Sequence, residues 1–167
     1  MLTRDLNKAK KWVKAQCQGT TRYGLIASSG ALRLKPEGIF VKNEISVANW
    51  FLNGKDDVRS SYMLEDVVTE FDIQGLELDY SIVAWDADFR FTDGEWTYNS
   101  FSGNKWNTMR NTEKILYLKN TYRVLLTRAR QGMVIFIPKG NESDHTRLPE
   151  YYNETYNYLK SIGIEEI

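Results

Sequence analysis

Hydrophobic residues follow helical and strand-like spacing in turn along the chain. Near the start, Leu6, Ala9 and Val13 lie three or four residues apart, which predicts an amphipathic helix over residues 3–17. Residues 22–27 then form a short apolar run of strand length, and a Ser-Ser-Gly turn follows it. The chain therefore opens with a predicted helix and a predicted strand.

The middle of the chain predicts two more strands and a hairpin. Brief apolar runs at residues 66–69 and 80–85 have the length of buried strands, and a short helix is expected over residues 46–52. Further on, aromatic residues alternate on both sides of Asp93-Gly94, a dipeptide that favours a tight β-turn. We expect this β-hairpin to be an insertion in a larger fold.

The C-terminal part of the chain predicts a helix, a strand and a helix. Apolar residues line one face of residues 112–130, and Gly132 is placed to cap that helix. Residues 133–137 are almost purely apolar, as expected of a central parallel strand, and residues 148–161 form a final helix. This order of elements predicts an α/β fold with a mostly parallel sheet flanked by helices.

Length and composition are those of one globular domain. The chain has 167 residues, of which 42% are hydrophobic and 26% are charged, and this size fits a single core. No apolar run reaches the roughly 18 residues of a membrane-spanning helix, and the first residues lack the apolar stretch of a secretory signal. We therefore expect a cytoplasmic protein with no membrane partner.

Charge and the rare residue types exclude several kinds of site. The formal net charge is zero, so no overall field draws the domain to nucleic acid, although basic residues gather near the start and acidic residues near the end. The single Cys17 cannot form an internal disulfide, and His145 is the only histidine, so there is no zinc-ligand cluster. We expect Cys17 to be a small buried hydrophobe and His145 to face solvent.

Two stretches about fifty residues apart carry the candidate chemistry. The first is Thr69-Glu-Phe-Asp-Ile-Gln-Gly-Leu-Glu77, in which Gly75 permits a backbone angle or a close approach that a β-carbon would forbid. The second is Asn120-Thr-Tyr-Arg-Val-Leu-Leu-Thr-Arg-Ala-Arg130, which leads into the last apolar strand. Gln-Gly-Leu-Glu alone fits any polar turn. It becomes informative because it precedes an apolar strand and lies about fifty residues before Thr-Arg-Ala.

Three arginines border the apolar face of the helix predicted over residues 112–130. At about 100° per residue, Arg128 falls on one flank of that face, and Arg123 and Arg130 fall on the other. A guanidinium held on a rigid helix loses little entropy on binding, and its planar donors match a phosphate or a carboxylate. The alternative is that these arginines form surface salt bridges with acidic residues of the chain.

In their order and spacing, the two stretches resemble motifs V and VI of superfamily 1 DNA/RNA helicases. Phrases such as Ala27-Ser-Ser-Gly-Ala-Leu-Arg33 and Asp57-Val-Arg-Ser-Ser-Tyr62 extend the resemblance over most of the chain, to the C-terminal part of a Schlafen-like family of DNA/RNA helicases. The resemblance implies a RecA-like, three-layer αβα domain over residues 1–167. This domain would be the second motor domain of an ATP-hydrolysing helicase or translocase.

The resemblance also implies roles in an ATP site. By the match to motif VI, Arg128 is the arginine finger that reaches the γ-phosphate and stabilises charge in the transition state, and Arg123 supports it. By the match to motif V, Glu77 lies near the ribose and the γ-phosphate, and Gly75 belongs to the same site.

Partners follow from the same resemblance. ATP with Mg²⁺ would bind between this domain and an N-terminal RecA-like domain of the same polypeptide, and single-stranded DNA or RNA would be held near Thr69 and Gln74. No Gly-x-x-x-x-Gly-Lys-Ser/Thr phosphate loop occurs in the chain. We therefore expect the first domain to carry that loop, and this chain alone neither to bind ATP tightly nor to hydrolyse it.

One departure from the helicase pattern supports an alternative function. Relatives usually place an arginine just after the first strand, as motif IV, where this chain has Ser28 and Ser29, and the nearest following arginine is Arg33. Whether Arg33 substitutes stays open. The alternative is a non-catalytic nucleic-acid-binding or protein-interaction module that kept the fold and lost the motor.

Two further groups of residues have both a functional and a structural interpretation. Asp86 and Asp88 follow a predicted strand, as a magnesium-binding carboxylate would, but without a phosphate loop we interpret them as strand-end turn residues. The aromatic residues between Trp85 and Trp106 have the chemistry to stack on single-stranded bases. We favour their packing against the sheet, with one or two rings left exposed.

Overall fold

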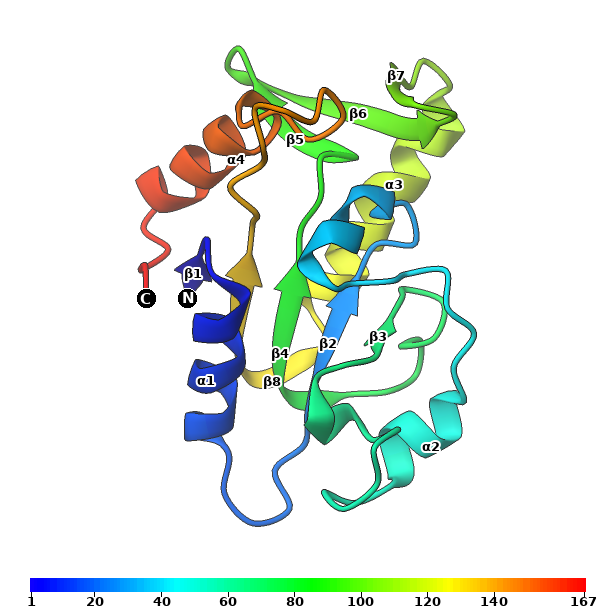
Figure 1. Cartoon of the computed structure of the whole chain (residues 1–167), viewed down its shortest axis with the longest axis vertical. Helices are drawn as coiled ribbons and strands as arrows, with labels where there is room; N and C mark the ends of the chain where they lie inside the picture. Colours follow the sequence, from blue (N-terminus) through cyan, green and yellow to red (C-terminus); the bar gives the residue numbers. More distant parts are fainter.

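A parallel sheet of five strands forms the centre of the computed structural model, which describes all 167 residues (Figure 1). The strand order is β1-β8-β4-β2-β3, and every neighbouring pair is parallel. The strands are β1 (Leu2–Thr3), β2 (Tyr23–Ala27), β3 (Val67–Val68), β4 (Leu78–Ala84) and β8 (Ala129–Phe136). The predicted α/β fold with a mostly parallel sheet is confirmed.

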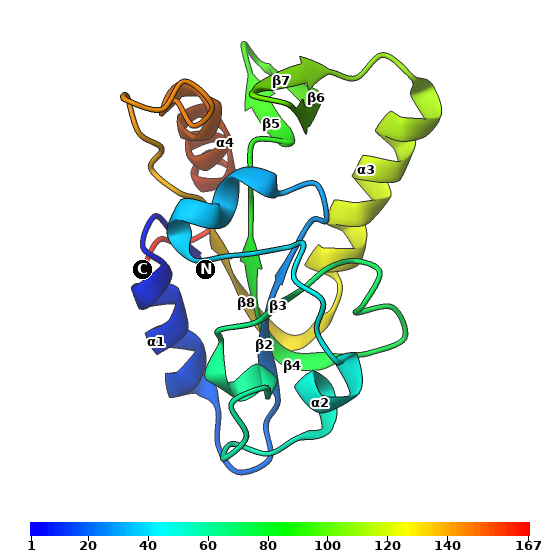
Figure 2. The same ribbon diagram turned by 45° about the vertical axis from the view of Figure 1, so that its right-hand side comes forward.

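Helices cover both faces of the sheet, which gives three layers (Figure 2). One face carries α1 (Leu6–Gln16) and the 3-10 helix η1 (Leu32–Glu37), and the other carries α2 (Val47–Leu52), α3 (Thr112–Leu126) and α4 (Glu150–Ser161). A short 3-10 helix, η2 (Ser61–Met63), precedes β3. Successive strand residues serve opposite faces: in β4, Ile82 belongs to the core under α1 and Val83 to the core under α3. This layering is consistent with a RecA-like αβα fold.

A small antiparallel sheet lies across the carboxyl ends of the parallel strands (Figure 1). Its strands, β5 (Phe89–Thr92), β6 (Glu95–Ser102) and β7 (Lys105–Thr108), are called the meander below. Asp93 and Gly94 form the first turn, both with positive φ, as a tight hairpin of this twist requires. The predicted hairpin is therefore confirmed, and the sequence analysis missed its third strand.

The packing of β2 against α2 depends on a missing side chain. Gly24 lies in β2, and a β-carbon placed there would be 2.5 Å from the indole ring of Trp50. Trp50 is 1% exposed and also packs on the core beneath α3. Gly24 therefore lets the sheet accept the largest side chain of α2.

The boundary between α3 and β8 differs from the prediction. The helix ends at Leu126 with Thr127 as its cap, and the strand begins at Ala129. The reason is tertiary: Ala129 pairs with Leu78 of β4, whose backbone N–H donates to the carbonyl of Arg128 at 3.0 Å. The helix predicted to continue to residue 130, and its cap at residue 132, are wrong, so the helical placement of Arg128 and Arg130 is wrong too.

The start of the chain also forms a strand that periodicity did not reveal. Leu2 and Thr3 pair with β8, and the carboxylate of Asp5 then caps α1 by accepting from the backbone of Asn7 and Lys8. The helix predicted over residues 3–17 therefore begins at Leu6. None of the helices combines the length and apolar character needed to cross a membrane.

Candidate functional site

The sequence-predicted site residues divide between the two ends of the parallel sheet. Thr69 directly follows β3, so it lies at the carboxyl ends of the strands. Gly75 and Glu77 directly precede β4, and Arg128 directly precedes β8, so these three lie at the amino ends. The structure therefore brings Gly75, Glu77 and Arg128 to one end and separates Thr69 from them.

At the amino ends, backbone geometry sets Glu77 beside Arg128. The N–H of Leu78 donates to the carbonyl of Arg128, so the residues before β4 and β8 are tied together. Gly75 has φ of +78°, a left-handed conformation that favours glycine and turns the chain into β4. The carboxylate of Glu77 is paired with Arg130 at 3.7 Å, and both side chains are 62% exposed.

Arg128 is half-buried and lacks a protein partner. Its Nε is buried without a hydrogen-bond acceptor, and its guanidinium forms no ion pair. A buried donor without an acceptor carries a desolvation cost of roughly 1–3 kcal/mol, which an anionic ligand would offset. The alternative interpretation of Arg128 as a surface salt-bridge residue is therefore wrong, whereas it is correct for Arg130.

Asp79 holds this end of the sheet together, and the sequence analysis did not single it out. Its carboxylate accepts from the backbone N–H of Arg22 at 2.8 Å, from Gln131 at 3.1 Å and from Arg130 at 3.2 Å. The hydrogen bond from Arg22 is the main cause that lowers the pKa of Asp79 below its usual range. β2, β4 and β8 are thereby tied together beside Arg128.

The other predicted residues occupy different surroundings. Arg123 is exposed on α3 and donates to the side chain of Asn120 at 2.5 Å. Gln74 is exposed and its side chain forms no hydrogen bond within the chain. Thr69 is 7% exposed, and its hydroxyl donates to Asp72 at 2.7 Å. The Thr69 hydroxyl is therefore already engaged within its own turn.

A pocket of about 320 Å³ lies at the carboxyl ends of the strands. It sits where β2 is flanked by β3 and β4, the point of an α/β sheet at which ligands commonly bind. Glu70, only 3% exposed, accepts from the backbone and hydroxyl of Ser29 at 2.8 and 2.7 Å, and from Tyr117 and Thr121 at 3.1 and 3.2 Å. Sequence reasoning missed Glu70, because only the fold brings these donors to it.

Asp86 and Asp88 are fully buried at the end of β4. Asp88 accepts from the hydroxyls of Ser28 at 2.7 Å and Tyr122 at 2.5 Å, and Asp86 accepts from Tyr152 at 3.0 Å. Burial, with Asp86 as a second cause, raises the pKa of Asp88 to about 7. Both carboxylates accept from hydroxyl and backbone groups of neighbouring elements. They therefore connect the end of β4 to those elements, in agreement with the interpretation of Asp86 and Asp88 as strand-end residues.

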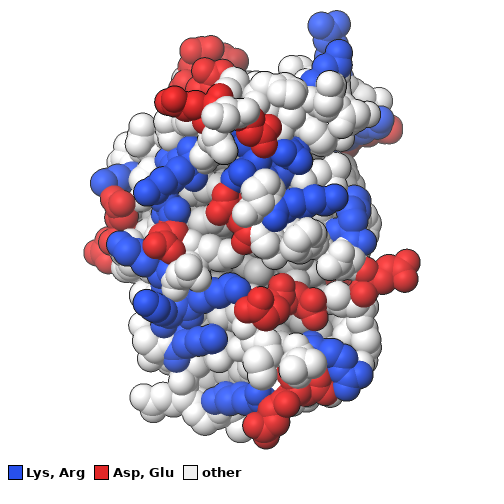
Figure 3. Space-filling model, in the orientation of Figure 1, with Lys and Arg blue, Asp and Glu red and all other residues white.

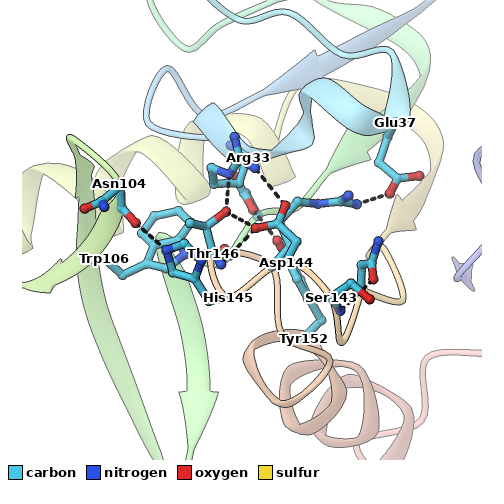
Figure 4. Close-up of polar contacts among 12 residues, drawn as sticks. Arg33, Glu37, Asn104, Trp106, Ser143, Asp144, His145, Thr146 and Tyr152 are labelled. Atoms are coloured by element: carbon cyan, nitrogen blue, oxygen red, sulfur yellow. Dashed lines mark hydrogen bonds and ion pairs between the residues drawn. The ribbon is translucent and has the colours of Figure 1, made fainter.

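Arg33 belongs to the carboxyl end of the sheet. Its Nε donates to Thr146 at 2.7 Å, and its guanidinium pairs with Asp144 at 2.9 Å, as Figure 4 shows. The indole N–H of Trp106 donates to the carbonyl of Thr146 in the same loop at 2.8 Å. His145 is exposed, as predicted, with Nε2 near the Asn104 carbonyl at 3.1 Å. Arg33 therefore does not join Arg128 at the amino ends.

Charge is mixed over the surface. On the face seen in Figure 3, Lys and Arg side chains gather over α1 and otherwise alternate with Asp and Glu. Several pairs neutralise one another, such as Lys10 with Glu65 at 3.1 Å and Lys160 with Glu166 at 2.6 Å. No group of three or more His, Cys, Asp or Glu residues is arranged to hold a metal ion, and Cys17 is half-buried.

Comparison with known proteins identifies one family. A family model described as Schlafen group 3, DNA/RNA helicase domain, matches residues 1–139. No curated protein and no solved structure matches the chain. The matched residues include all five strands of the parallel sheet, the meander and α3, whereas α4 lies beyond them.

Proposed function

Because the chain belongs to the Schlafen group 3, DNA/RNA helicase domain family, we propose that it is the second motor domain of an ATP-dependent helicase or translocase. In this proposal residues 1–167 form a single RecA-like domain of the superfamily 1 type. The first RecA-like domain, with the phosphate loop, would precede it in the same polypeptide. ATP would bind between the two domains.

The observation that carries this proposal is the unpartnered Arg128. Its half-buried guanidinium lies at the amino ends of the strands, and its Nε has no acceptor within the chain. A γ-phosphate oxygen would supply that acceptor, and a fixed arginine stabilises the charge that develops during phosphoryl transfer. We assign the role of arginine finger to Arg128.

Glu77 and Gly75 would complete the surface that faces ATP. The left-handed Gly75 turns the chain sharply before β4, and Glu77 follows on the exposed side beside Arg130. Glu77 would lie near the ribose and the γ-phosphate, with Arg130 beside its carboxylate. Arg123, which lies on α3 away from Glu77, would support the site only from its edge.

Mg²⁺ would be held mainly by the first domain, since this chain has no cluster of metal ligands. Opening and closing of the cleft would move the protein along single-stranded DNA or RNA, with the strand passing near Thr69 and Gln74. The buried Thr69 hydroxyl already donates to Asp72, so its turn would contact the strand chiefly through backbone groups.

ATP turnover by the natural polypeptide that contains this chain tests the proposal. Turnover should rise when single-stranded DNA or RNA is added, and Arg128→Ala should lower it roughly a hundredfold or more, because a transition-state contact is lost. Arg110→Ala is the matched control, since Arg110 is an exposed arginine without a hydrogen bond or ion pair, and it should keep wild-type turnover.

A second candidate function is a non-catalytic nucleic-acid-binding or protein-interaction module. It is favoured by one observation: Ser28 and Ser29 stand after β2, and Arg33 is engaged by Asp144 rather than available to a nucleotide. Equal turnover in wild type and Arg128→Ala, or none in either, would support this module and contradict the motor.

A further inference from the structure

A groove of about 470 Å³ runs between the second half of α3 and the meander. Phe89, Trp96 and Tyr98 of the meander line one side, and Lys119 and Arg123 of α3 stand on the other. No aspartate or glutamate lines the groove. Its surface is therefore aromatic and basic, in a protein whose net charge is zero.

The three rings form a continuous row because of the strand register. Phe89 pairs directly with Tyr98 across β5 and β6, so both side chains project from the same face of the meander. Their rings are stacked at 5.3 Å, and Phe89 and Trp96 are 4.5 Å apart. Tyr122, 1% exposed, packs against Phe89 from below. Tyr122 thus holds the row on its buried side, and the half-buried rings line the groove on the other side.

Other rings of the same segment have structural partners. Trp85 is 3% exposed and donates its indole N–H to the carbonyl of Phe89 at 2.5 Å. Phe91 stacks on Tyr158 of α4 at 4.3 Å, and Trp106 bonds to the loop before α4. The packing interpretation is therefore confirmed for these rings. None of the rings between Trp85 and Trp106 is fully exposed, so the expectation of one or two exposed rings is wrong; the row of three is half-buried and lines the groove.

We propose that this groove binds single-stranded nucleic acid, with bases stacked on Tyr98 and Trp96 and a phosphate facing Lys119. The ammonium of Lys119 lies 5.0 Å from the centre of the Tyr98 ring, so a base on this ring would have its phosphate near a cation. Rigid rings flanked by cations are what sequence-tolerant binding of a single strand requires. The inference rests on the proposed function only in taking a nucleic-acid strand as the ligand. Thr69 is not among the residues that line the groove.

Fluorescence anisotropy with the 167-residue chain tests the groove directly. The probe is a fluorescein-labelled oligodeoxythymidine of about 16 nucleotides, long enough to cover one small-domain site. Tyr98→Ala and Lys119→Glu should each raise Kd about tenfold, by loss of one stacked base or by reversal of one phosphate contact. Tyr98→Phe keeps the ring and should bind like wild type. A blunt-ended duplex of the same length should bind more weakly, because its bases are not open to stacking.

Lys11→Glu is the matched control, because Lys11 is an exposed lysine on α1, on the opposite face of the sheet. It makes the same charge change as Lys119→Glu and should leave Kd unchanged. Thermal unfolding of Lys119→Glu, an exposed position, should match wild type and show that the fold is intact. Equal Kd values for wild type, Tyr98→Ala and Lys119→Glu, or no binding by wild type, would overturn the inference. If Arg128→Ala still abolishes ATP turnover in that case, the motor proposal stands and only the groove fails.

Discussion

At the residue scale, the chemistry of this domain depends on which polar groups find partners. Arg128 has none, and it is the arginine proposed to act on ATP. Asp88 has three donors, from Ser28, Tyr122 and the backbone of Phe89, yet its burial raises its pKa to about 7. A buried carboxylate with this pKa makes the stability of the protein depend on pH.

Because of Asp88, the free energy of unfolding should fall as pH rises. A carboxyl pKa that is raised in the folded state means that the unfolded state binds fewer protons between pH of about 4 and about 7, so the free energy of unfolding falls across that window. Each pKa unit corresponds to about 1.4 kcal/mol, so the loss should reach a few kcal/mol. Urea unfolding between about pH 5 and pH 8 should show this loss in wild type and a clearly smaller loss in Asp88→Asn, where only Asp86, whose pKa is also raised by burial, still contributes. The exposed control Asp93→Asn should behave like wild type, and a flat wild-type profile would contradict the prediction.

At the element scale, close approach between β2 and α2 fixes the packing of the sheet. Gly24 leaves room for the Trp50 ring, which a β-carbon would meet at 2.5 Å. Both elements are short, since α2 has six residues and β2 has five. Their contact therefore depends on shape.

Gly24→Ala should lower the free energy of unfolding by about 1–3 kcal/mol, because the new methyl group overpacks a buried ring. Gly54→Ala is the matched control, since a β-carbon there meets nothing within 4 Å. Urea unfolding of both variants makes the comparison. A Gly24→Ala protein as stable as Gly54→Ala would show that α2 moves aside at little cost.

At the scale of the whole molecule, residues far apart in the chain close the carboxyl end of the sheet. Arg33 of η1 reaches Asp144 and Thr146, more than a hundred positions later, and Trp106 of the meander joins the same loop. Arg147 of that loop in turn pairs with Glu37. The opposite end of the sheet carries Arg128, whose Nε has no acceptor within the chain.

Arg33→Ala should therefore act on stability rather than on ATP turnover. It removes a partly buried, charge-assisted pair, at a cost of about 1–3 kcal/mol, and should speed hydrogen exchange in residues 141–147 but not in residues 76–79. Arg59→Ala is the control, since Arg59 is 60% exposed and pairs with Asp57 in its own loop, where such pairs contribute little. A loss of turnover in Arg33→Ala comparable to that in Arg128→Ala would instead make Arg33 the replacement for the motif IV arginine.

Much of the fold could be predicted from local pattern. The strands before Ser28 and Asp86, the turn at Asp93-Gly94 and the last helix lie where periodicity and turn residues place them. The end of α3 could not be predicted this way, because residues 112–130 keep an apolar pattern that suits a helix or a strand. Pairing with β4 decides that Ala129 begins a strand. β1 and β7 were missed for the same reason, since such short strands exist only through their neighbours.

The α/β class, the hairpin at Asp93-Gly94 and the two motif stretches could be read from the sequence, because they follow from spacing and from residue types that act locally. The pairing of charges depends instead on the tertiary structure. The tertiary structure placed Arg130 on Glu77 and Asp79, left Arg128 without an acceptor and surrounded Glu70 with hydroxyl groups. Such partners come from distant parts of the chain, and contacts of that range carry no local signal in the sequence.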